Sequence, residues 1–139
     1  MKKIVLITGA NGMLAKALAS HLSNDYDIRF LSRGKSKPNE FFWDPSQNFI
    51  DPEALVGVHH IIHLAGATIG NKRWTNKRKN LILSSRVDGA HLIRKELSTN
   101  KQQIESFISI SGVGYYGTVT SEKKFDELSS WLSHSSKSI

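Results

Sequence analysis

The sequence predicts an α/β fold in which a parallel sheet carries helices on both faces. Short apolar runs rich in β-branched residues alternate with stretches of helical periodicity, the pattern of consecutive βαβ units. Parallel neighbours need long crossover connections, which are right-handed and usually helical. The chain has 139 residues, a size that suits one hydrophobic core but not two domains of ordinary size.

The first βα unit is expected within residues 4–22. Residues 4–7 form a continuous apolar run, as in a strand buried on both faces. Residues 8–12 form a turn with two glycines, which leads directly into a stretch with apolar residues at i, i+3, i+4 and i+7. The residues of this stripe are Ala15, Leu18, Ala19 and Leu22.

Extended segments with a turn between them follow this unit. Residues 27–32 predict a second strand, because three apolar side chains precede a polar loop. Residues 41–50 place aromatic and apolar residues on both sides of Asp-Pro-Ser, which predicts a short edge strand or a hairpin. A short helix is expected at 52–55, where Pro52 suits the first helical position.

A third strand, a long helix and a fourth strand complete the pattern. Residues 59–65 and 107–111 predict the strands. Between them, from about residue 75 to residue 98, one helical face carries Ile82, Arg86, Gly89, Ile93 and Leu97. Further apolar residues widen this face, and we expect them to be buried within the domain, with contact to a partner subunit as the alternative. They are Leu81, Leu83, Val87 and Leu92.

The pattern weakens beyond Gly117. Of the twelve residues 128–139, six are serine, a composition too polar for a packed core. We therefore expect a domain over residues 1–117 and a divergent, unpacked tail over residues 118–139.

Composition narrows the function classes. The chain has no cysteine, so disulfides and thiolate zinc sites are excluded. A net charge of +7 favours anionic partners such as phosphates, nucleic acids or acidic membranes. The apolar N-terminal run is too short for a signal peptide or a membrane span, so a cytoplasmic protein without membrane contact is expected. Basic residues gather near Trp74, but without any nucleic-acid-binding signature, so nucleic acid is not favoured.

The turn between the first strand and the first helix is a candidate phosphate-binding site. Backbone N–H groups and the positive end of the helix dipole meet there. Gly9 suits the turn, Gly12 removes a Cβ that would collide with a diphosphate, and Ala15 lets the helix pack closely. The alternative is a strand-to-helix turn without a ligand. The expected contacts are Thr8, Gly9, Asn11, Gly12 and Met13.

Several motifs carry a resemblance to a known family. The turn has the spacing Thr-Gly-x-x-Gly-x-x-Ala, and WDP (43–45), LAGA (64–67), KRWT (72–75), SRVDG (85–89) and SISGVGYYG (109–117) follow. With these, residues 2–117 resemble the extended, NAD(P)-dependent epimerase/dehydratase-like branch of the short-chain dehydrogenase/reductase superfamily. Within that branch they resemble a subgroup labelled nucleoside-diphosphate-sugar epimerase-like or cell-division-inhibitor-like.

The resemblance implies a Rossmann-like doubly wound parallel sheet. In extended members a catalytic helix, a further strand and a substrate-capping domain follow the segment matching Tyr116. We therefore expect a chain truncated before the catalytic helix and the substrate domain.

The end of the second strand bears on the choice of nucleotide. NAD-selective enzymes usually carry an acidic residue there, which binds the ribose 2′-hydroxyl. Here the strand ends in Ser32 and Arg33, whose hydroxyl and guanidinium suit a 2′-phosphate. The resemblance implies the same preference, NADP(H) over NAD(H). The alternative is a plain surface arginine.

Other expected cofactor contacts follow from the resemblance. In the family the segment matching Leu64, Ala65 and Gly66 passes the ribose and nicotinamide half of the cofactor; a plain strand-ending turn is the alternative. Arg86 stands where extended members commonly carry asparagine. We expect it to bind a cofactor phosphate or an anionic substrate, with an ion pair on the helix surface as the alternative.

The catalytic residues are incomplete. The resemblance assigns Ser111 to orienting a substrate carbonyl or hydroxyl. The superfamily's proton-transfer pair is a tyrosine with a lysine four residues later, and this pair is missing. The residues four positions after the tyrosines are Phe30, Val119 and Thr120. No metal site is expected at His59, His60 and His63, because a strand places the first and third far apart and the second on the other face.

Two functions remain open from the sequence. The first is the NADP-binding part of an oxidoreductase or epimerase-like enzyme, inactive alone and acting on an unknown small molecule. The second is a non-catalytic dinucleotide-binding or interaction module linked to cell division, as the subgroup label suggests.

Overall fold

The computed structural model describes residues 1–34, 37–70, 73 and 75–110, and single residues at 122, 124, 126 and 128. The chain divides into two compact units, Met1–Ser109 and Ile110–Ile139. The sheet and both helices described below belong to the first unit. The boundary expected at residue 117 and the residue Ser111 lie outside the described residues.

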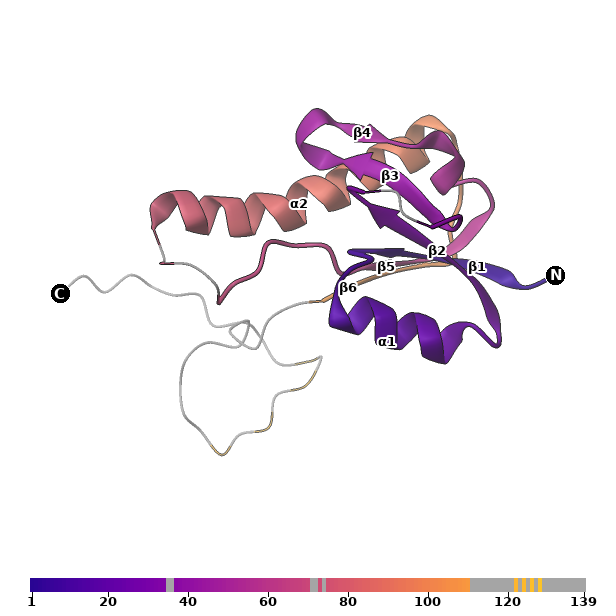
Figure 1. Ribbon diagram of the computed structural model, residues 1–139, viewed down its shortest axis with the longest axis horizontal. Helices are drawn as coiled ribbons and strands as arrows, with labels where there is room; N and C mark the ends of the chain where they lie inside the picture. The colour runs from indigo at the N-terminus through magenta and orange to yellow at the C-terminus, as the bar shows by residue number, and fades with distance from the viewer. Residues whose placement is uncertain are drawn as a thin grey trace. The chain divides into compact units, whose positions relative to one another are not determined.

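One sheet of six strands organises the first unit (Figure 1), in the order β4-β3-β2-β1-β5-β6. The strands are β1 (Lys3–Thr8), β2 (Tyr26–Ser32), β3 (Glu40–Asp44), β4 (Phe49–Ile50), β5 (Val58–His63) and β6 (Ser106–Ser109). All neighbours pair in parallel except β3 and β4. Because the chain builds outward from β1 first on one side and then on the other, the expected doubly wound sheet is confirmed.

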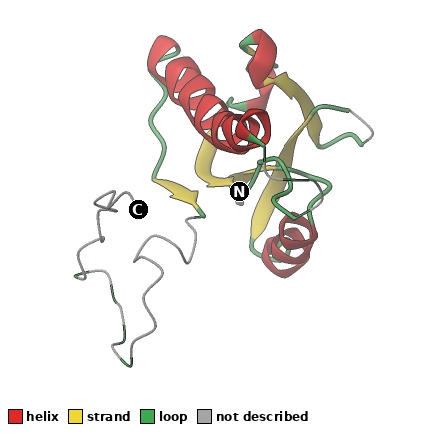
Figure 2. Ribbon diagram, turned by 90° about the vertical axis from the view of Figure 1, so that its left-hand side faces the viewer, coloured by secondary structure: helices red, strands yellow, loops and turns green. Residues whose placement is uncertain are grey.

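Helices cover opposite faces of this sheet, as Figure 2 shows for α1 (Met13–Leu22) and α2 (Asn76–Thr99). Val5 and Ile7 of β1 pack in the cluster that contains Ala15 of α1. Leu6, between them, belongs to the other cluster, with Ile93 of α2. Side chains alternate along a strand, so β1 supplies both cores and is buried on both faces, as its apolar run predicts.

The expected hairpin is present between β3 and β4. Trp43 pairs with Ile50 and Asp44 with Phe49 in antiparallel register. The turn holds a 3₁₀ helix, η1 (Pro45–Gln47), and a second one, η2 (Pro52–Ala54), follows the hairpin. These elements place the indole of Trp43 in the core.

Strand β5 ends at His63, two residues before the expected end. The N–H groups of Leu64 and Ala65 donate to the side-chain hydroxyl of Thr8, at 3.0 and 2.9 Å. These bonds replace a strand ladder, so the chain leaves the sheet at that point.

Of the four residues expected to widen the buried face of α2, Leu92 is buried, and the expectation was wrong for Leu81, Leu83 and Val87. The exposed fractions of Leu81, Leu83 and Val87 are 50%, 65% and 39%. Burial in α2 is confined to Gly89, Leu92 and Ile93. The reason is visible in Figure 1, where the first half of α2 extends past the ends of the strands. Neither helix of the described residues is long and apolar enough to cross a membrane.

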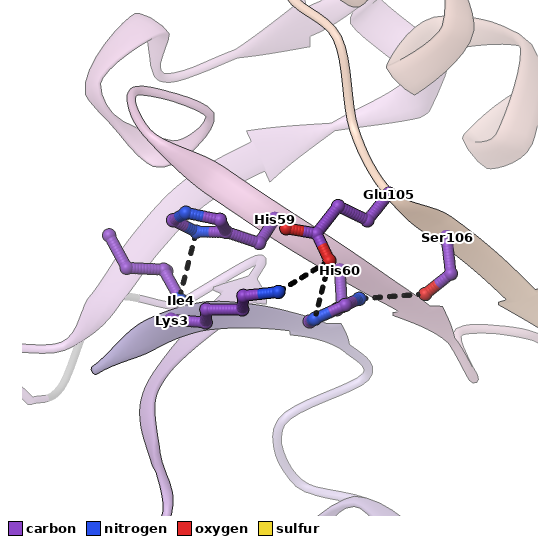
Figure 3. Close-up of polar contacts among 6 residues, drawn as sticks. All are labelled: Lys3, Ile4, His59, His60, Glu105 and Ser106. Carbon is purple, nitrogen blue, oxygen red and sulfur yellow. Dashed lines mark hydrogen bonds and ion pairs between the residues drawn. The ribbon is translucent and has the colours of Figure 1, made fainter. Parts of the chain in front are cut away.

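A polar cluster joins β1, β5 and β6 at the amino edge of the sheet (Figure 3). Lys3 Nζ lies 2.7 Å from Glu105 Oε2, and His60 lies between Glu105, at 3.7 Å, and the Ser106 hydroxyl, at 2.9 Å. His59 Nδ1 accepts the N–H of Ile4 at 3.1 Å. Bonding to Lys3 lowers the pKa of Glu105 below its usual range. These two histidines therefore serve contacts between strands.

Candidate functional site

The carboxyl ends of β1, β2 and β5 meet at Gly9. Its φ of +81° lies in the left-handed region, which favours glycine. Its N–H donates to the carbonyl of Leu31 on β2, at 3.3 Å. A Cβ at Gly9 would lie 3.3 Å from the Cα of Ala65, just after β5. Both the backbone conformation and the space therefore require glycine here.

Helix α1 begins immediately after this turn. Gly12 is the N-cap and provides no side-chain cap, and the first turn of the helix has no acidic residue. The N–H of Lys16 bonds to the Gly12 carbonyl at 3.2 Å, so the N–H groups of residues 13–15 precede the first intrahelical bond. A helix start of this kind, with no carboxylate beside it, suits an anion.

The close approach at Gly12 depends on its missing side chain. Its N–H donates to the Gly9 carbonyl at 2.8 Å, and a Cβ would lie 3.1 Å from the same oxygen. Asn11 and Met13 flank it and are exposed. Ala15, one turn on, is 1% exposed and packs α1 against the sheet.

A buried network joins Thr8 to the segment after β5. Thr8 is fully buried and His63 is 4% exposed. Thr8 Oγ1 lies 3.0 Å from His63 Nδ1, and His63 Nε2 lies 3.0 Å from the Arg86 carbonyl of α2. The same Thr8 oxygen accepts the N–H groups of Leu64 and Ala65. The network therefore fixes the end of β5 to the end of β1 and to α2.

Desolvation lowers the pKa of His63 below its usual value, and the charge of Arg86 lowers it further; the bond to the Arg86 carbonyl acts in the opposite direction. The ring of Trp43 meets His63 edge-on, with 6.2 Å between centroids. A Cβ at Gly89 would lie 2.9 Å from Trp43 Cη2 and 3.0 Å from His63 Cε1. Gly89 thus lets α2 approach both rings.

Residues of α2 hold the loop that follows Ala65. The Arg86 guanidinium donates to the carbonyls of Ala67, at 3.3 Å, and Ile82, at 2.9 Å. A Cβ at Gly66 would lie 2.8 Å from Arg86 Cζ, so the absence of a side chain at Gly66 makes room for Arg86. Ser85 Oγ accepts the N–H of Ala67 at 2.8 Å. Among the described residues Arg86 has carbonyl partners and no carboxylate partner.

The end of β2 presents Ser32 and Arg33. The Ser32 hydroxyl donates to the Gly34 carbonyl at 2.7 Å and accepts the Gly34 N–H at 3.1 Å, which closes a local turn. Arg33 is exposed. Asp44 ends the neighbouring strand β3; bonds from Ser46 chiefly hold its pKa below the usual range, and the charge of Arg33 adds to this.

The structure gathers most of the predicted binding residues at one edge of the sheet. Direct contacts or bonds link Gly9, Gly12, Thr8, Leu64 and Ala65 there. Gly66 and Arg86 contact each other beside them. Two further pairs lie at the same edge without a bond between them among the described residues: Ser32 and Arg33 at the end of β2, and Asn11 and Met13 at the start of α1.

Sequence reasoning missed the roles of His63 and Asp44. For His63 the sequence predicts packing or solvent exposure rather than a metal ligand, but it does not predict the buried hydrogen bonds to Thr8 of β1 and Arg86 of α2. Asp44 was part of the WDP motif, whose position at the end of a strand next to β2 places a carboxylate near Arg33. Both features depend on strand order, which periodicity does not supply.

The comparisons with known proteins agree with this geometry. Residues 5–136 match the model of the NAD dependent epimerase/dehydratase family. An epimerase family protein of Mycobacterium leprae is 30% identical over 128 residues, which are 91% of this chain and 41% of that protein. The chain thus spans about two-fifths of the length of this curated relative.

Solved structures give the same result. The crystal structure of human epimerase family protein SDR39U1 (isoform 2) with NADPH superposes with a TM-score of 0.74 at 25% identity, over 92% of this chain and 42% of that one. A nucleoside-diphosphate sugar epimerase from Corynebacterium glutamicum gives 0.73 at 26% identity, over 94% and 27%. The Rossmann-like fold and the family resemblance are confirmed. The chain belongs to the NAD dependent epimerase/dehydratase family.

Proposed function

We propose that this chain binds NADP(H) and forms the dinucleotide-binding part of an oxidoreductase or epimerase-like enzyme. The observation that carries the proposal is the turn at Gly9 and Gly12, where two missing side chains open the uncapped start of α1 to a diphosphate. Membership of a family named for its NAD dependence supports it. So does the similarity to a human protein whose crystal structure contains NADPH.

The preference for NADP(H) rests on the end of β2. β2 does not end in an acidic residue that could bind a ribose 2′-hydroxyl. Instead, the guanidinium of the exposed Arg33 follows it and suits a 2′-phosphate. The local turn at Gly34 holds the Ser32 hydroxyl in place beside it. Asp44 lies close enough for Arg33 to lower its pKa, and we expect it to orient the guanidinium.

The chain is proposed to hold the cofactor without turning it over alone. A proton-transfer pair of tyrosine and lysine four residues apart is missing from the 139 residues. The substrate is a small molecule. The groups that act on it are then contributed by residues other than these. Ser111 keeps its proposed role of orienting that substrate.

Titration with NADPH and with NADH tests the proposal. The wild-type chain should bind NADPH more tightly than NADH and show no oxidation of NADPH above background. Gly12→Ala places a methyl group where the diphosphate would approach, in an extended backbone conformation that alanine also adopts, and should weaken NADPH binding about tenfold or more. Gly70→Ala is the control, because its Cβ would meet nothing within 4 Å.

Two results would contradict the proposal. If the wild-type chain binds neither nucleotide, the dinucleotide site is absent. If Gly12→Ala binds NADPH as tightly as Gly70→Ala does, the turn is not where the phosphates lie.

A further inference from the structure

His63 is a buried histidine beside the turn at Gly9 and Gly12. It is 4% exposed, and both ring nitrogens have partners from other elements. Its ring contacts Trp43 of β3 and Phe107 of β6, with centroid distances of 6.2 and 6.0 Å. The one charged group that faces it among the described residues is Arg86 of α2. The ring is therefore enclosed by β1, β3, β6 and α2.

The hydrogen-bond partners determine which nitrogen carries the proton. The Arg86 carbonyl only accepts, so Nε2, 3.0 Å away, must be the donor. In the neutral ring Nδ1 is then an acceptor, and it receives the hydroxyl proton of Thr8 at 3.0 Å. The geometry thus requires the neutral tautomer with hydrogen on Nε2.

The Thr8 hydroxyl can form no further hydrogen bond. It donates its only proton to His63, and its oxygen accepts the N–H groups of Leu64 and Ala65. Two acceptor lone pairs and one donor are all in use. The ring of His63 therefore sets the rotation of the hydroxyl, and the hydroxyl sets the position of the chain after β5.

That position matters for the phosphate turn. The backbone of Ala65 lies directly under Gly9, where an added Cβ would be 3.3 Å from both the Ala65 N and Cα. Because Gly9 packs against the Ala65 backbone, a shift of Ala65 would change the position of the turn.

Protonation of the ring conflicts with this network. A hydrogen on Nδ1 would point at the Thr8 oxygen, whose lone pairs are already occupied by two N–H groups. The hydroxyl proton would lose its acceptor at the same time. One of the bonds to Leu64 or Ala65 must then break, and an unpaired buried donor is costly.

We propose that His63 is a positioning residue that works only as the neutral ring: it orients the Thr8 hydroxyl, which holds Leu64 and Ala65 under the phosphate turn, so that dinucleotide affinity falls when the ring is protonated. This rests on the proposed dinucleotide binding. Burial already lowers the pKa of His63, so the neutral form is the one present at neutral pH. By linkage, bound dinucleotide must lower the pKa of His63 further, because it binds the neutral form preferentially.

The experiment is a ¹⁵N NMR titration of the wild-type chain, free and saturated with NADP⁺, which withstands acid. The free chain should show the tautomer protonated at Nε2, and the amide signals of Leu64 and Ala65 should change with the midpoint of the His63 titration. The midpoint should be lower in the complex, by about 0.7 pH units for a fivefold coupling. A tautomer protonated at Nδ1, or the same midpoint with and without NADP⁺, would overturn the proposal.

Variants distinguish the effect of His63 protonation on NADP⁺ affinity from the effect of protonating the cofactor itself. The 2′-phosphate also gains a proton near pH 6, so NADP⁺ affinity is compared between wild type and His63→Asn, whose amide oxygen can accept from Thr8 but does not titrate. As the pH falls from about 8 through the His63 midpoint that the NMR titration locates, the wild type should lose up to about fivefold more affinity than His63→Asn. The control is His60→Gln, on the same strand, which should keep the wild-type profile.

The outcomes are distinguishable. If wild type binds NADP⁺ at about pH 8 and the profiles of wild type and His63→Asn coincide, the role of His63 is refuted and dinucleotide binding stands. If wild type does not bind at any pH, the proposed function itself fails.

Discussion

Gly89 offers the sharpest test of how α2 packs on the site. In Gly89→Ala, the new Cβ would lie 2.9 Å from Trp43 Cη2 and 3.0 Å from His63 Cε1, both in buried rings. Alanine raises helix propensity by about 1 kcal/mol over glycine, whereas overpacking a core costs about 1–3 kcal/mol. We expect the overpacking to exceed the gain, with a net loss of about 1 kcal/mol in the free energy of unfolding.

The measurement is equilibrium unfolding in urea of four chains: wild type, Gly89→Ala, Trp43→Phe and the double variant. Phenylalanine lacks the far edge of the indole, so Gly89→Ala should be less harmful in that background, with a coupling energy of about 1 kcal/mol. Ser98→Ala, at an exposed position of the same helix, controls for propensity and should not destabilise. If Gly89→Ala stabilises the wild type by the full propensity gain, α2 does not approach the rings as described.

The remaining predictions concern charges. Arg33→Ala should weaken NADPH binding about tenfold and leave NADH binding unchanged; Arg94→Ala, which removes the same charge elsewhere, should change neither affinity, as calorimetry would show. The folded pKa of Glu105 lies below 4.5, so its ion pair contributes stability above that pH, and the contribution is lost as pH falls through the folded pKa. Urea unfolding of Lys3→Met should therefore show a flatter acid dependence, and an unchanged slope would contradict the pairing. The folded pKa of His63 lies below 6.5, so stability should be full above pH 6.5 and decline below it; His63→Asn should lack this decline.

Local patterns were sufficient to predict the elements of this fold. The apolar run of β1 and the stripe of α1 gave strand, turn and helix in the observed order, and φ at Gly9 is positive, as the tight turn suggested. Each of these features depends on residues close together in the sequence. Periodicity of 2 or 3.6 residues and glycine's freedom at positive φ are enough to predict them.

Features that depend on neighbours in space were harder to predict. β5 stops at His63 because a hydroxyl from Thr8, on another strand, takes the next two N–H groups. Leu83 is exposed because its part of α2 passes beyond the sheet, which the helical stripe does not reveal.

In the candidate site, too, features set by nearby residues in the sequence could be predicted, and features set by neighbours in space could not. Glycine spacing located the phosphate turn, since its chemistry is local. The binding role of Arg86, expected from its place in a motif, stays a prediction, whereas the bonds of its guanidinium to the carbonyls of Ala67 and Ile82 were not predicted. Those partners become neighbours only after the loop folds back on α2.

The most direct test of the central claim is to map NADPH on the amide signals of the ¹⁵N-labelled chain. We expect the largest shifts at Gly9, Gly12 and Met13, with a second group at Leu64–Gly66. Dinucleotide binding at the turn is contradicted if NADPH causes no shifts, or if the largest shifts lie in the second half of α2 while the turn and the segment after β5 remain unchanged.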